Sequence, residues 1–156
     1  MNHTIRTGTL KDLQTIAAFN SAMAEETEGR ALQKDIILPG VEAVLQDPLK
    51  GFYLLAEDEG KIIGQLMITF EWSDWRNGNI WWIQSVYVQP EARRKGVYKS
   101  LYEEVCRIAL KSKVTGIRLY VDEFNDDAQK VYSSLGMRES HYVMYEAILP
   151  QQVSDR

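Results

Sequence analysis

The chain has 156 residues, of which 45% are hydrophobic, so it has the size and the apolar content of one globular domain with a real core. Its net charge of −4 argues against a general nucleic-acid binder, which would carry a strong basic excess. No apolar run approaches the roughly 18 to 20 residues that span a bilayer, and the single cysteine, Cys106, excludes an internal disulfide and fits a reducing compartment. We expect one cytoplasmic domain over residues 1–150 with a frayed tail at 151–156, no secretory signal after Met1, and neither a nucleic-acid nor a membrane partner.

Two helices are predicted in the first third of the chain. Thr9 has the N-cap position of a helix start, and apolar residues at helical spacing continue this helix to about Ala24. The polar stretch 25–34 predicts a loop or an irregular helix. Proline is favoured at a first helical position, so a short second helix is expected from Pro39 to just before Pro48.

The middle of the chain predicts an antiparallel hairpin followed by a central strand. Glu59-Gly60 and the Asn-Gly-Asn sequence at 77–79 are turn signals. The run before Pro90 is almost continuously apolar, as in a strand that is covered on both faces. Together with an edge strand near the N-terminus, the strands expected here lie at 3–6, 52–57, 61–72 and 80–88.

Helices and strands alternate in the rest of the chain. After the central strand we expect a helix at 99–111, a strand at 117–121, a helix at 125–135 and one or two final strands within 137–149. The predicted order therefore contains both a hairpin and a strand-helix-strand crossover. Such an order predicts an α/β fold with a mixed sheet.

The basic segment at 93–98, Arg-Arg-Lys-Gly-Val-Tyr, lies between the central strand and the next helix. Backbone N–H groups of such a loop and of the first helical turn can point at one ligand, and the helix dipole favours negative charge there. The segment lacks the paired glycines and Lys-Ser/Thr of a P-loop, and it lacks the three glycines of a dinucleotide-binding loop. We expect the ligand to carry phosphate.

Two stretches resemble motifs of the GNAT superfamily of N-acetyltransferases. Residues 86–101, VYVQPEARRKGVYKSL, resemble its acetyl-CoA signature, in which a strand ending in Val-x-Pro precedes an Arg/Gln-x-x-Gly-x-Gly/Ala loop. Residues 125–137, NDDAQKVYSSLGM, resemble its Asn-x-x-Ala-x-x-x-Tyr-x-x-x-Gly-Phe helix. Tyr98 departs from the first motif, because the family has Gly or Ala there. The resemblance covers essentially the whole chain. It implies a mostly antiparallel central sheet with a V-shaped splay between the fourth and fifth strands, flanked by about four helices.

The resemblance also implies acetyl-CoA as co-substrate, with no metal. Backbone N–H groups of the loop would hold the pyrophosphate, and the end of the central strand would pair with the pantetheine arm. The residues expected to bind the cofactor are Val86, Tyr87, Val88, Arg93, Arg94, Lys95, Gly96, Val97, Tyr98, Lys99, Asn125 and Tyr132. Tyr132 matches the family position of the general acid, and its phenol would protonate the leaving thiolate.

The general base and the acceptor site are less well defined by the pattern. Many family members carry Glu on the central strand, where this chain has Gln84. The candidate bases are therefore Glu71 and Asp74, Glu25 or Glu28 of the first-helix loop, or a chain of water molecules. Tryptophans mixed with acids suit a cationic amine. We expect the acceptor to be bound by Glu25, Glu28, Trp72, Trp75 and Gln84.

The resemblance leaves several functions open. The acceptor is expected to be a small cationic amine, such as a polyamine, an amino sugar or an amino-acid amine, attacked directly in a ternary complex. A protein N-terminus, a protein lysine or an aminoglycoside is the alternative acceptor. A non-catalytic acyl-CoA-binding or sensory module is the alternative function, supported by Gln84 and opposed by Tyr132. Final strands often pair across subunits in this family, so a homodimer is also compatible with the sequence.

Overall fold

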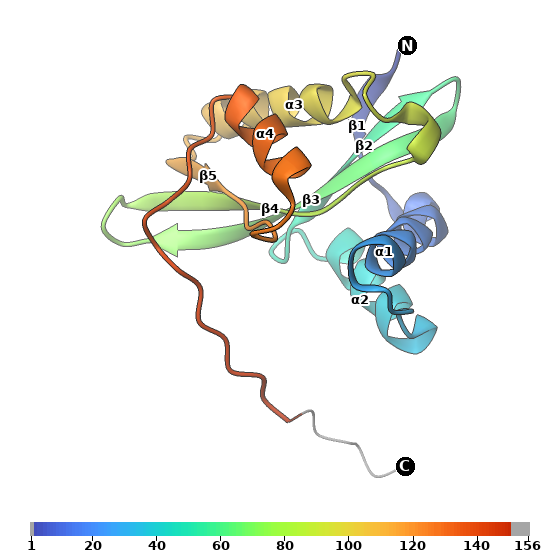
Figure 1. Cartoon of the computed structure of the whole chain (residues 1–156), viewed down its shortest axis with the longest axis horizontal. Helices are drawn as coiled ribbons and strands as arrows, with labels where there is room; N and C mark the ends of the chain where they lie inside the picture. Colours follow the sequence, from blue (N-terminus) through green and yellow to red (C-terminus); the bar gives the residue numbers. More distant parts are fainter. Residues whose placement is uncertain (1, 151–156) are drawn as a thin grey trace. The chain divides into compact units, whose positions relative to one another are not determined.

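A five-stranded sheet forms the centre of the first of two compact units, which comprise residues 1–120 and 121–156. The computed structural model describes residues 2–150, so the tail expected at 151–156 lies outside the described residues. The strands lie in the order β1-β2-β3-β4-β5 (Figure 1). All neighbours pair antiparallel except β4 and β5, which confirms the mixed, mostly antiparallel sheet. The strands are β1 (Thr4–Thr7), β2 (Phe52–Asp58), β3 (Lys61–Ser73), β4 (Gly78–Val88) and β5 (Gly116–Arg118).

Helices cover both faces of this sheet, because alternate strand residues point to opposite faces and both faces carry apolar side chains. The helices of this unit are α1 (Leu13–Glu28), α2 (Lys34–Gln46) and α3 (Val97–Lys111). Tyr53 and Leu55 of β2 pack on one face with Ile16 of α1. Leu54 packs on the other face with Leu101 of α3. Figure 1 shows α3 on one side of the sheet and α1 and α2 on the other. Each fully buried Leu or Ile contributes about 1.5–3 kcal/mol, so these two cores hold the sheet in place.

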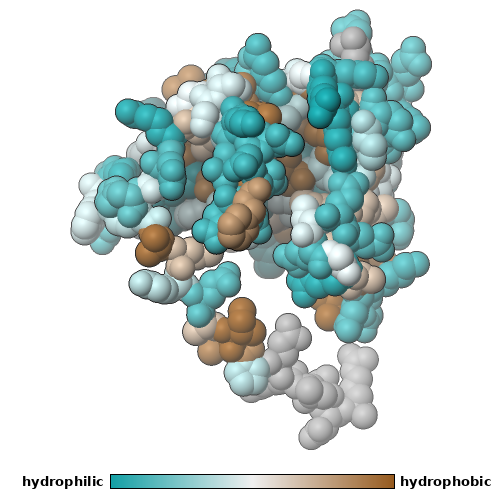
Figure 2. Space-filling view, viewed as in Figure 1, coloured by the Kyte–Doolittle hydropathy of each residue, from teal (hydrophilic) through white to brown (hydrophobic). Residues whose placement is uncertain are grey.

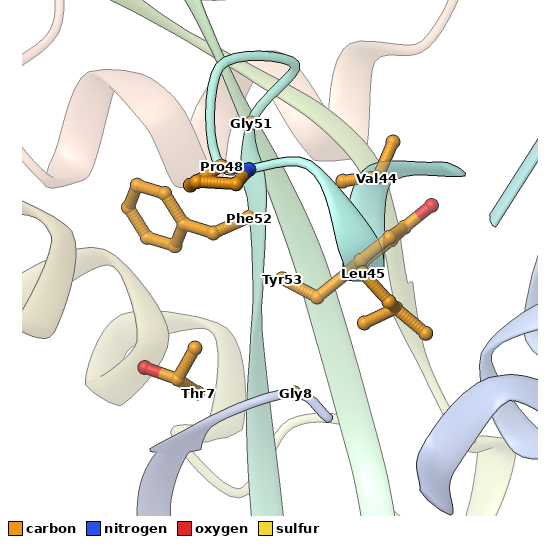
Figure 3. Close-up of a pocket in the computed structure, with 8 residues that line it drawn as sticks. All are labelled: Thr7, Gly8, Val44, Leu45, Pro48, Gly51, Phe52 and Tyr53. Carbon is orange, nitrogen blue, oxygen red and sulfur yellow. The ribbon is translucent and has the colours of Figure 1, made fainter. Parts of the chain in front are cut away.

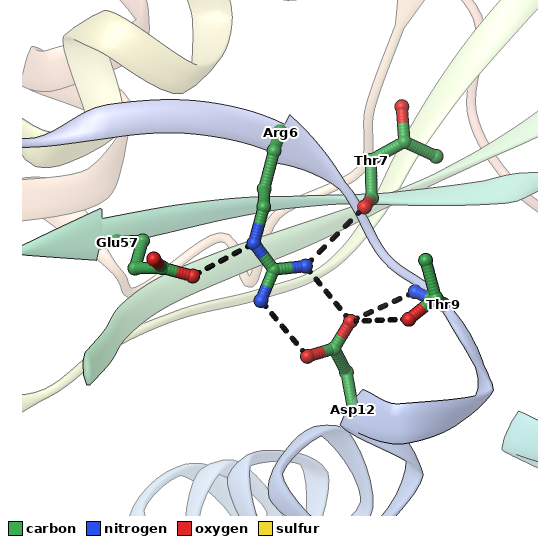
Figure 4. A network of polar contacts seen from close by, with 5 residues as sticks. All are labelled: Arg6, Thr7, Thr9, Asp12 and Glu57. Carbon is green, nitrogen blue, oxygen red and sulfur yellow. Dashed lines mark hydrogen bonds and ion pairs between the residues drawn. The ribbon is translucent and has the colours of Figure 1, made fainter. Parts of the chain in front are cut away.

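A polar network fixes the start of α1 to the edge of the sheet (Figure 4). The Arg6 guanidinium of β1 donates to both carboxylate oxygens of Asp12 at 2.9 Å and to Glu57 of β2 at 2.7 Å. Asp12 also accepts the backbone N–H of Thr9 at 2.8 Å, in the N-terminal turn Leu10–Asp12 that precedes α1. The Arg6 guanidinium holds the pKa of Asp12 below its usual range, because it stabilises the ionised carboxylate.

Two helix boundaries differ from the sequence prediction. α1 continues past Ala24 to Glu28, into the segment expected as a loop or an irregular helix, and its C-cap is Gly29, which has a φ of 63°. α2 begins at Lys34 and contains Pro39, so Pro39 does not start the helix. The preceding turn carries Ile37, which packs against the core under α1 and α2. This contact of Ile37 favours a helix start before Pro39, although Lys34, Asp35 and Ile36 are exposed, and the helix tolerates the loss of the hydrogen bond that proline cannot donate. Among the described residues, no helix is long and apolar enough to cross a membrane.

A bulge interrupts the pairing of β3 and β4. Gln65 lies opposite Tyr87, whereas Met67 lies opposite Gln84, so two residues of β4 face the single residue between them on β3. Ser85 lies in the bulge with a φ of 52°, a left-handed conformation that side chains rarely adopt. The bulge bends β4 and turns its last residues relative to the strand before it.

The parallel ladder between β4 and β5 is short. It joins Ile80 to Gly116, Trp81 to Ile117 and Trp82 to Arg118, and there it ends. β4 continues to Val88, and no strand among the described residues pairs with the β5-facing edge of its last part. The two strands therefore separate after Trp82. This confirms the predicted splay between the fourth and fifth strands.

The second unit contains α4 (Asp126–Ser134). The Asn125 side chain caps this helix by accepting the N–H of Ala128 at 3.1 Å. No strand is found in the described part of the segment after Gly136, so the prediction of final strands is wrong there. Its alternating apolar residues make no ladder and remain exposed, with Tyr145 at 94%. Figure 2 shows such hydrophobic side chains in the segment directly before the grey residues, whereas most of the visible surface is hydrophilic.

Candidate functional site

The loop between β4 and α3 brings left-handed backbone and exposed cations to one helix start. Arg94 has a φ of 61°, and Gly96, the N-cap of α3, has a φ of 78°. Glycine adopts this conformation without a Cβ penalty, whereas Arg94 costs about 1 to 2 kcal/mol. Such residues turn successive backbone N–H groups toward one point, and the first helical turn adds N–H groups that have no intrahelical acceptor. With the exposed side chains of Arg94, Lys95 and Lys99, the loop has the features of an anion site.

The start of α3 lies directly on the sheet. Val97 is only 2% exposed, and a Cβ on Gly64 of β3 would lie 2.9 Å from its Cγ1. Gly64 pairs with Val88, so the close approach places the loop at the end of β4. Tyr98, the departure from the expected loop pattern, is half-buried and has its ring 6.4 Å from that of Tyr102. Its bulk is accommodated against the helix.

Arg93 ties the loop to β4 and α1. Its Nε donates to the carbonyl of Val88 at 2.8 Å, and its Nη2 donates to Glu26 at 2.7 Å. The guanidinium carbon lies 5.5 Å from the ring centre of Tyr87, whose hydroxyl contacts Glu26 at 3.4 Å. Burial and the nearby Glu26 carboxylate raise the pKa of Tyr87. Arg93 therefore holds the loop in position, in contrast to the outward-facing Arg94.

A buried polar chain supports the bulge of β4. Gln65 is fully buried, and its Nε2 donates to Asn20 Oδ1 of α1 at 3.0 Å and to the carbonyl of Ser85 at 3.2 Å. Asn20 is 4% exposed, and burial raises the pKa of Tyr53. Buried polar groups destabilise a fold unless they are hydrogen-bonded. The hydrogen bonds of Gln65 therefore fix the position of α1 relative to the bulge.

A polar strip crosses β3, β4 and β5 on the α1 and α2 face of the sheet. Gln84 Nε2 donates to Thr69 Oγ1 at 3.0 Å. Next to this pair, Glu71 accepts from Trp82 Nε1 at 3.1 Å and from Arg118 Nη1 at 3.0 Å. Two of the predicted site residues, Glu71 and Gln84, thus lie on the same face. We call these five residues the β3–β5 polar strip.

The other predicted acceptor residues of the hairpin lie elsewhere. Asp74 and Trp75 are exposed in the turn between β3 and β4, where Asp74 Oδ1 accepts the Trp75 N–H at 2.9 Å. Trp72 is 62% exposed and, because it neighbours Glu71 on one strand, points to the opposite face. At about 3.3 Å per residue, the turn lies about 20 Å along β4 from Ser85. The structure does not bring these residues to the polar strip.

The remaining predicted residues lie at the ends of two helices. Glu25 and Glu28 are exposed in the last turn of α1, and Glu28 forms an ion pair with Arg30 at 2.7 Å. In the second unit, Asn125 is the cap of α4, and Tyr132 lies in the last turns of that helix. Burial raises the pKa of the Tyr132 phenol.

A separate cavity of about 160 Å³ lies where β1, α2 and β2 meet (Figure 3). It is lined mostly by apolar groups, and no ionisable side chain other than Tyr53 faces it. Its lining residues are Thr7, Gly8, Val44, Leu45, Pro48, Gly51, Phe52 and Tyr53. None of the residues predicted for the site lines this cavity. In the described residues, no group of three or more His, Cys, Asp and Glu side chains is placed to hold a metal ion.

Sequence reasoning missed four residues that shape the site. Arg118, Gln65, Asn20 and Glu26 were not among the predicted residues. Gln65 and Asn20 carried a detectable signal, because each is a polar residue at an apolar position of a strand or helix pattern. The partners of Glu26 and Arg118 are 67 and 47 residues away in sequence, so no local pattern reveals them.

Comparison with known proteins gives consistent matches. The model of the acetyltransferase (GNAT) family matches residues 12–137. Thialysine N-epsilon-acetyltransferase from Bos taurus is 30% identical over 78 residues, which is 50% of this chain and 45% of the relative. The match therefore spans about half the length of that curated relative.

Solved structures match over nearly the whole chain. A possible acetyltransferase from Clostridium difficile 630 is 45% identical with a TM-score of 0.90, and the match covers 97% of this chain and 100% of that one. A predicted acetyltransferase from Clostridium acetobutylicum, solved with acetyl-CoA, is 18% identical with a TM-score of 0.77, covering 94% and 96% of the two chains. At that identity the second match shows the fold alone.

Proposed function

This chain belongs to the acetyltransferase (GNAT) family, and on that premise we propose that it transfers the acetyl group of acetyl-CoA to the primary amine of a small cationic acceptor. The observation that carries the choice of donor is the 93–98 loop, with left-handed backbone and exposed cations at the start of α3. The acetyl-CoA bound by the Clostridium acetobutylicum neighbour supports the same donor. The bovine relative, named for the ε-nitrogen of thialysine, supports an amine acceptor.

The loop and β4 together fit the elongated shape of acetyl-CoA. The pyrophosphate is bound in this proposal by backbone N–H groups of Arg94, Gly96, Tyr98 and Lys99, and the exposed cationic side chains add positive charge. The edge of Val86–Val88 that β5 leaves unpaired offers N–H and C=O groups to the pantetheine amides, as an added strand would use them. The pyrophosphate-binding loop follows Val88 in the chain. The pantetheine arm therefore passes Val88 before the residues that precede it on β4, and the thioester lies toward Ser85.

The attacking amine must first lose a proton. A free alkyl amine has a pKa near 10.4, so deprotonation at pH 7 costs about 4 to 5 kcal/mol. Glu71 and Asp74, two of the candidate bases considered from the sequence, are poorly placed, because Asp74 lies at the hairpin turn and both carboxylate oxygens of Glu71 already accept hydrogen bonds. We infer that water held by Gln84 and Thr69, next to the bulge, carries the proton to solvent.

The leaving thiolate is protonated by Tyr132 in this proposal. Burial raises the pKa of Tyr132 above its ordinary value of about 10, so the phenol is protonated at neutral pH and able to donate. A thiol has a pKa near 8.5, so the transfer is uphill by about 2 kcal/mol or somewhat more. The release of CoA and the formation of the amide offset this unfavourable free energy of proton transfer.

The test is CoA release from acetyl-CoA in the presence of amines. We expect turnover with small cationic amines and a loss of at least about 100-fold in kcat for Tyr132→Phe, within the range for removal of an acid catalyst. Acetyl-CoA binding, measured by calorimetry, should be retained by that variant. The matched control is Tyr142→Phe, which changes an exposed tyrosine and should leave kcat unchanged.

One observation favours a second function. Gln84 cannot accept a proton usefully, and an acyl-CoA-binding or sensory module needs no base. Tight acetyl-CoA binding without CoA release on any amine, peptide or polyamine would support that module and refute the proposed reaction. Turnover on peptides in preference to free amines would instead support a protein acetyltransferase.

A further inference from the structure

We propose that Arg118 binds a carboxylate of the acceptor, so the acceptor is an amino acid that is acetylated on a side-chain amine. This inference rests on the proposed function and names its acceptor class. Its basis is the β3–β5 polar strip, at the point where β4 and β5 separate. Trp82 and Arg118 form the last step of the parallel ladder, so the guanidinium lies at the vertex of the splay.

Arg118 has unused donors that face solvent. Only Nη1 is engaged, with Glu71 at 3.0 Å, and the hydrogen bonds found among residues 2–150 leave its Nε and Nη2 without an acceptor. The side chain is 35% exposed, so it is neither buried nor fully solvated. A guanidinium presents five N–H donors in a planar fork that matches a carboxylate. The remaining donors suit one oxyanion ligand.

Glu71 holds this guanidinium in place. Its other oxygen accepts the indole N–H of Trp82 at 3.1 Å, so the carboxylate is fixed from two sides. The ring of Trp82 also lies 6.4 Å from that of Tyr120, which forms an aromatic wall beside the pair. Glu71 is thus a positioning residue, and it offsets part of the charge of Arg118. A purely cationic acceptor, such as a polyamine, gains nothing from a guanidinium at this place.

The spacing along β4 fits an amino acid with a long side chain. From Trp82 to Ser85 the strand rises about 10 Å. The carboxylate and the terminal amine of an extended lysine are about 7 Å apart, because they are joined by a chain of bonds of about 1.5 Å. A carboxylate at Arg118 would therefore leave the amine near Gln84, beside the bulge where the thioester is proposed to lie.

The experiment compares acceptors that differ only in the carboxylate. CoA release is measured with L-lysine, with lysinamide and with 1,5-diaminopentane. We expect kcat/KM for lysine to exceed that of both others by about 10- to 100-fold, which corresponds to about 1.4 to 2.8 kcal/mol. Arg118→Gln should reduce this ratio to within about threefold. Arg118→Lys keeps the positive charge but loses the planar set of guanidinium N–H donors. It should therefore give an intermediate ratio of kcat/KM values.

The control is Arg107→Gln, an exposed arginine of α3 that pairs with Glu104 and should leave the ratio unchanged. Equal or better turnover of diaminopentane by the wild type, or a lysine preference that survives in Arg118→Gln, overturns the inference. The same holds if amines are acetylated but no amino acid is. Absence of CoA release with every amine refutes the proposed reaction instead. In that case, calorimetric binding of lysine in the presence of CoA, compared between wild type and Arg118→Gln, still decides whether Arg118 binds the carboxylate.

Discussion

Replacing Gln65 with methionine tests whether the buried polar chain holds the bulge of β4 to α1. Gln65 is fully buried, and its Nε2 donates to Asn20 at 3.0 Å and to the carbonyl of Ser85 at 3.2 Å. Methionine has a similar length and volume but no N–H donor. The substitution therefore leaves one buried side-chain oxygen and one part-buried carbonyl without this donor, while changing the packing little.

The expected loss follows from the hydrogen bonds on both sides of the change. Each buried acceptor that loses its donor costs about 1–3 kcal/mol. Against this, Gln65 Oε1 is itself buried without a hydrogen-bond partner in the described part of the chain, and the substitution removes that atom. Removing this atom without a hydrogen-bond partner stabilises the fold by about 1–3 kcal/mol. We expect Gln65→Met to lower the free energy of unfolding by about 1–3 kcal/mol.

Urea unfolding at pH 7 measures this loss, and a double-mutant cycle with Asn20→Ala assigns it. The coupling between Gln65 and Asn20 should be about 1 kcal/mol, because the two side chains share one hydrogen bond. Met67→Leu is the matched control, since it changes a half-buried apolar residue on the same face of β3. The reasoning is refuted if the two losses add to within about 0.3 kcal/mol, or if Gln65→Met is as stable as the wild type.

Three further substitutions test other parts of the structure. Asp12→Asn should lower the free energy of unfolding by about 2 kcal/mol at pH 7. Because Arg6 depresses the pKa of Asp12, this stabilisation is present above the unfolded pKa of about 3.9 and disappears as the pH falls through the lower folded value. Denaturant titrations at pH 7 and pH 2 check this, and an equal gap at both pH values would contradict it. Gly64→Ala places a Cβ 2.9 Å from Val97 Cγ1 and should cost about 1–3 kcal/mol in thermal unfolding and weaken acetyl-CoA binding. Gly96→Ala meets no neighbour within 4 Å, so it should cost only the left-handed backbone penalty of about 1 kcal/mol, and a larger loss of stability would show an unrecognised contact.

The sequence predicted most of the fold because its strongest signals are local. The expected strands at 61–72 and 80–88 are Lys61–Ser73 and Gly78–Val88 in the structure, since their turns and their apolar runs are encoded by neighbouring residues. The start of α2 was missed because Ile37, in the turn before Pro39, packs against the core, and the helix-start preference of proline does not reveal that contact. The strands expected within 137–149 depend on partners that alternation alone does not supply.

Predictability of the site follows the same division. The 93–98 loop was located because its glycine, its cations and the following helix are contiguous in sequence. The contact of Arg93 with Glu26 was not predicted, because Glu26 lies on a helix far back in the chain. The β3–β5 polar strip was missed as a unit, because it assembles Glu71 and Arg118 across the sheet. Contacts of this kind depend on strand register, which a single sequence does not specify.

These features place the proposed donor and acceptor sites along one strand. The ladder with β5 ends at Trp82, the bulge lies at Ser85, and Val88 is tied to the loop by Arg93. A one-residue slip of β4 would move every one of its side chains to the opposite face, so the register of this strand sets both sites at once. Gln65 fixes that register from a fully buried position without lining either site. Loosening the bulge should therefore affect donor binding and acceptor selectivity together, whereas changes at Arg118 should affect selectivity alone.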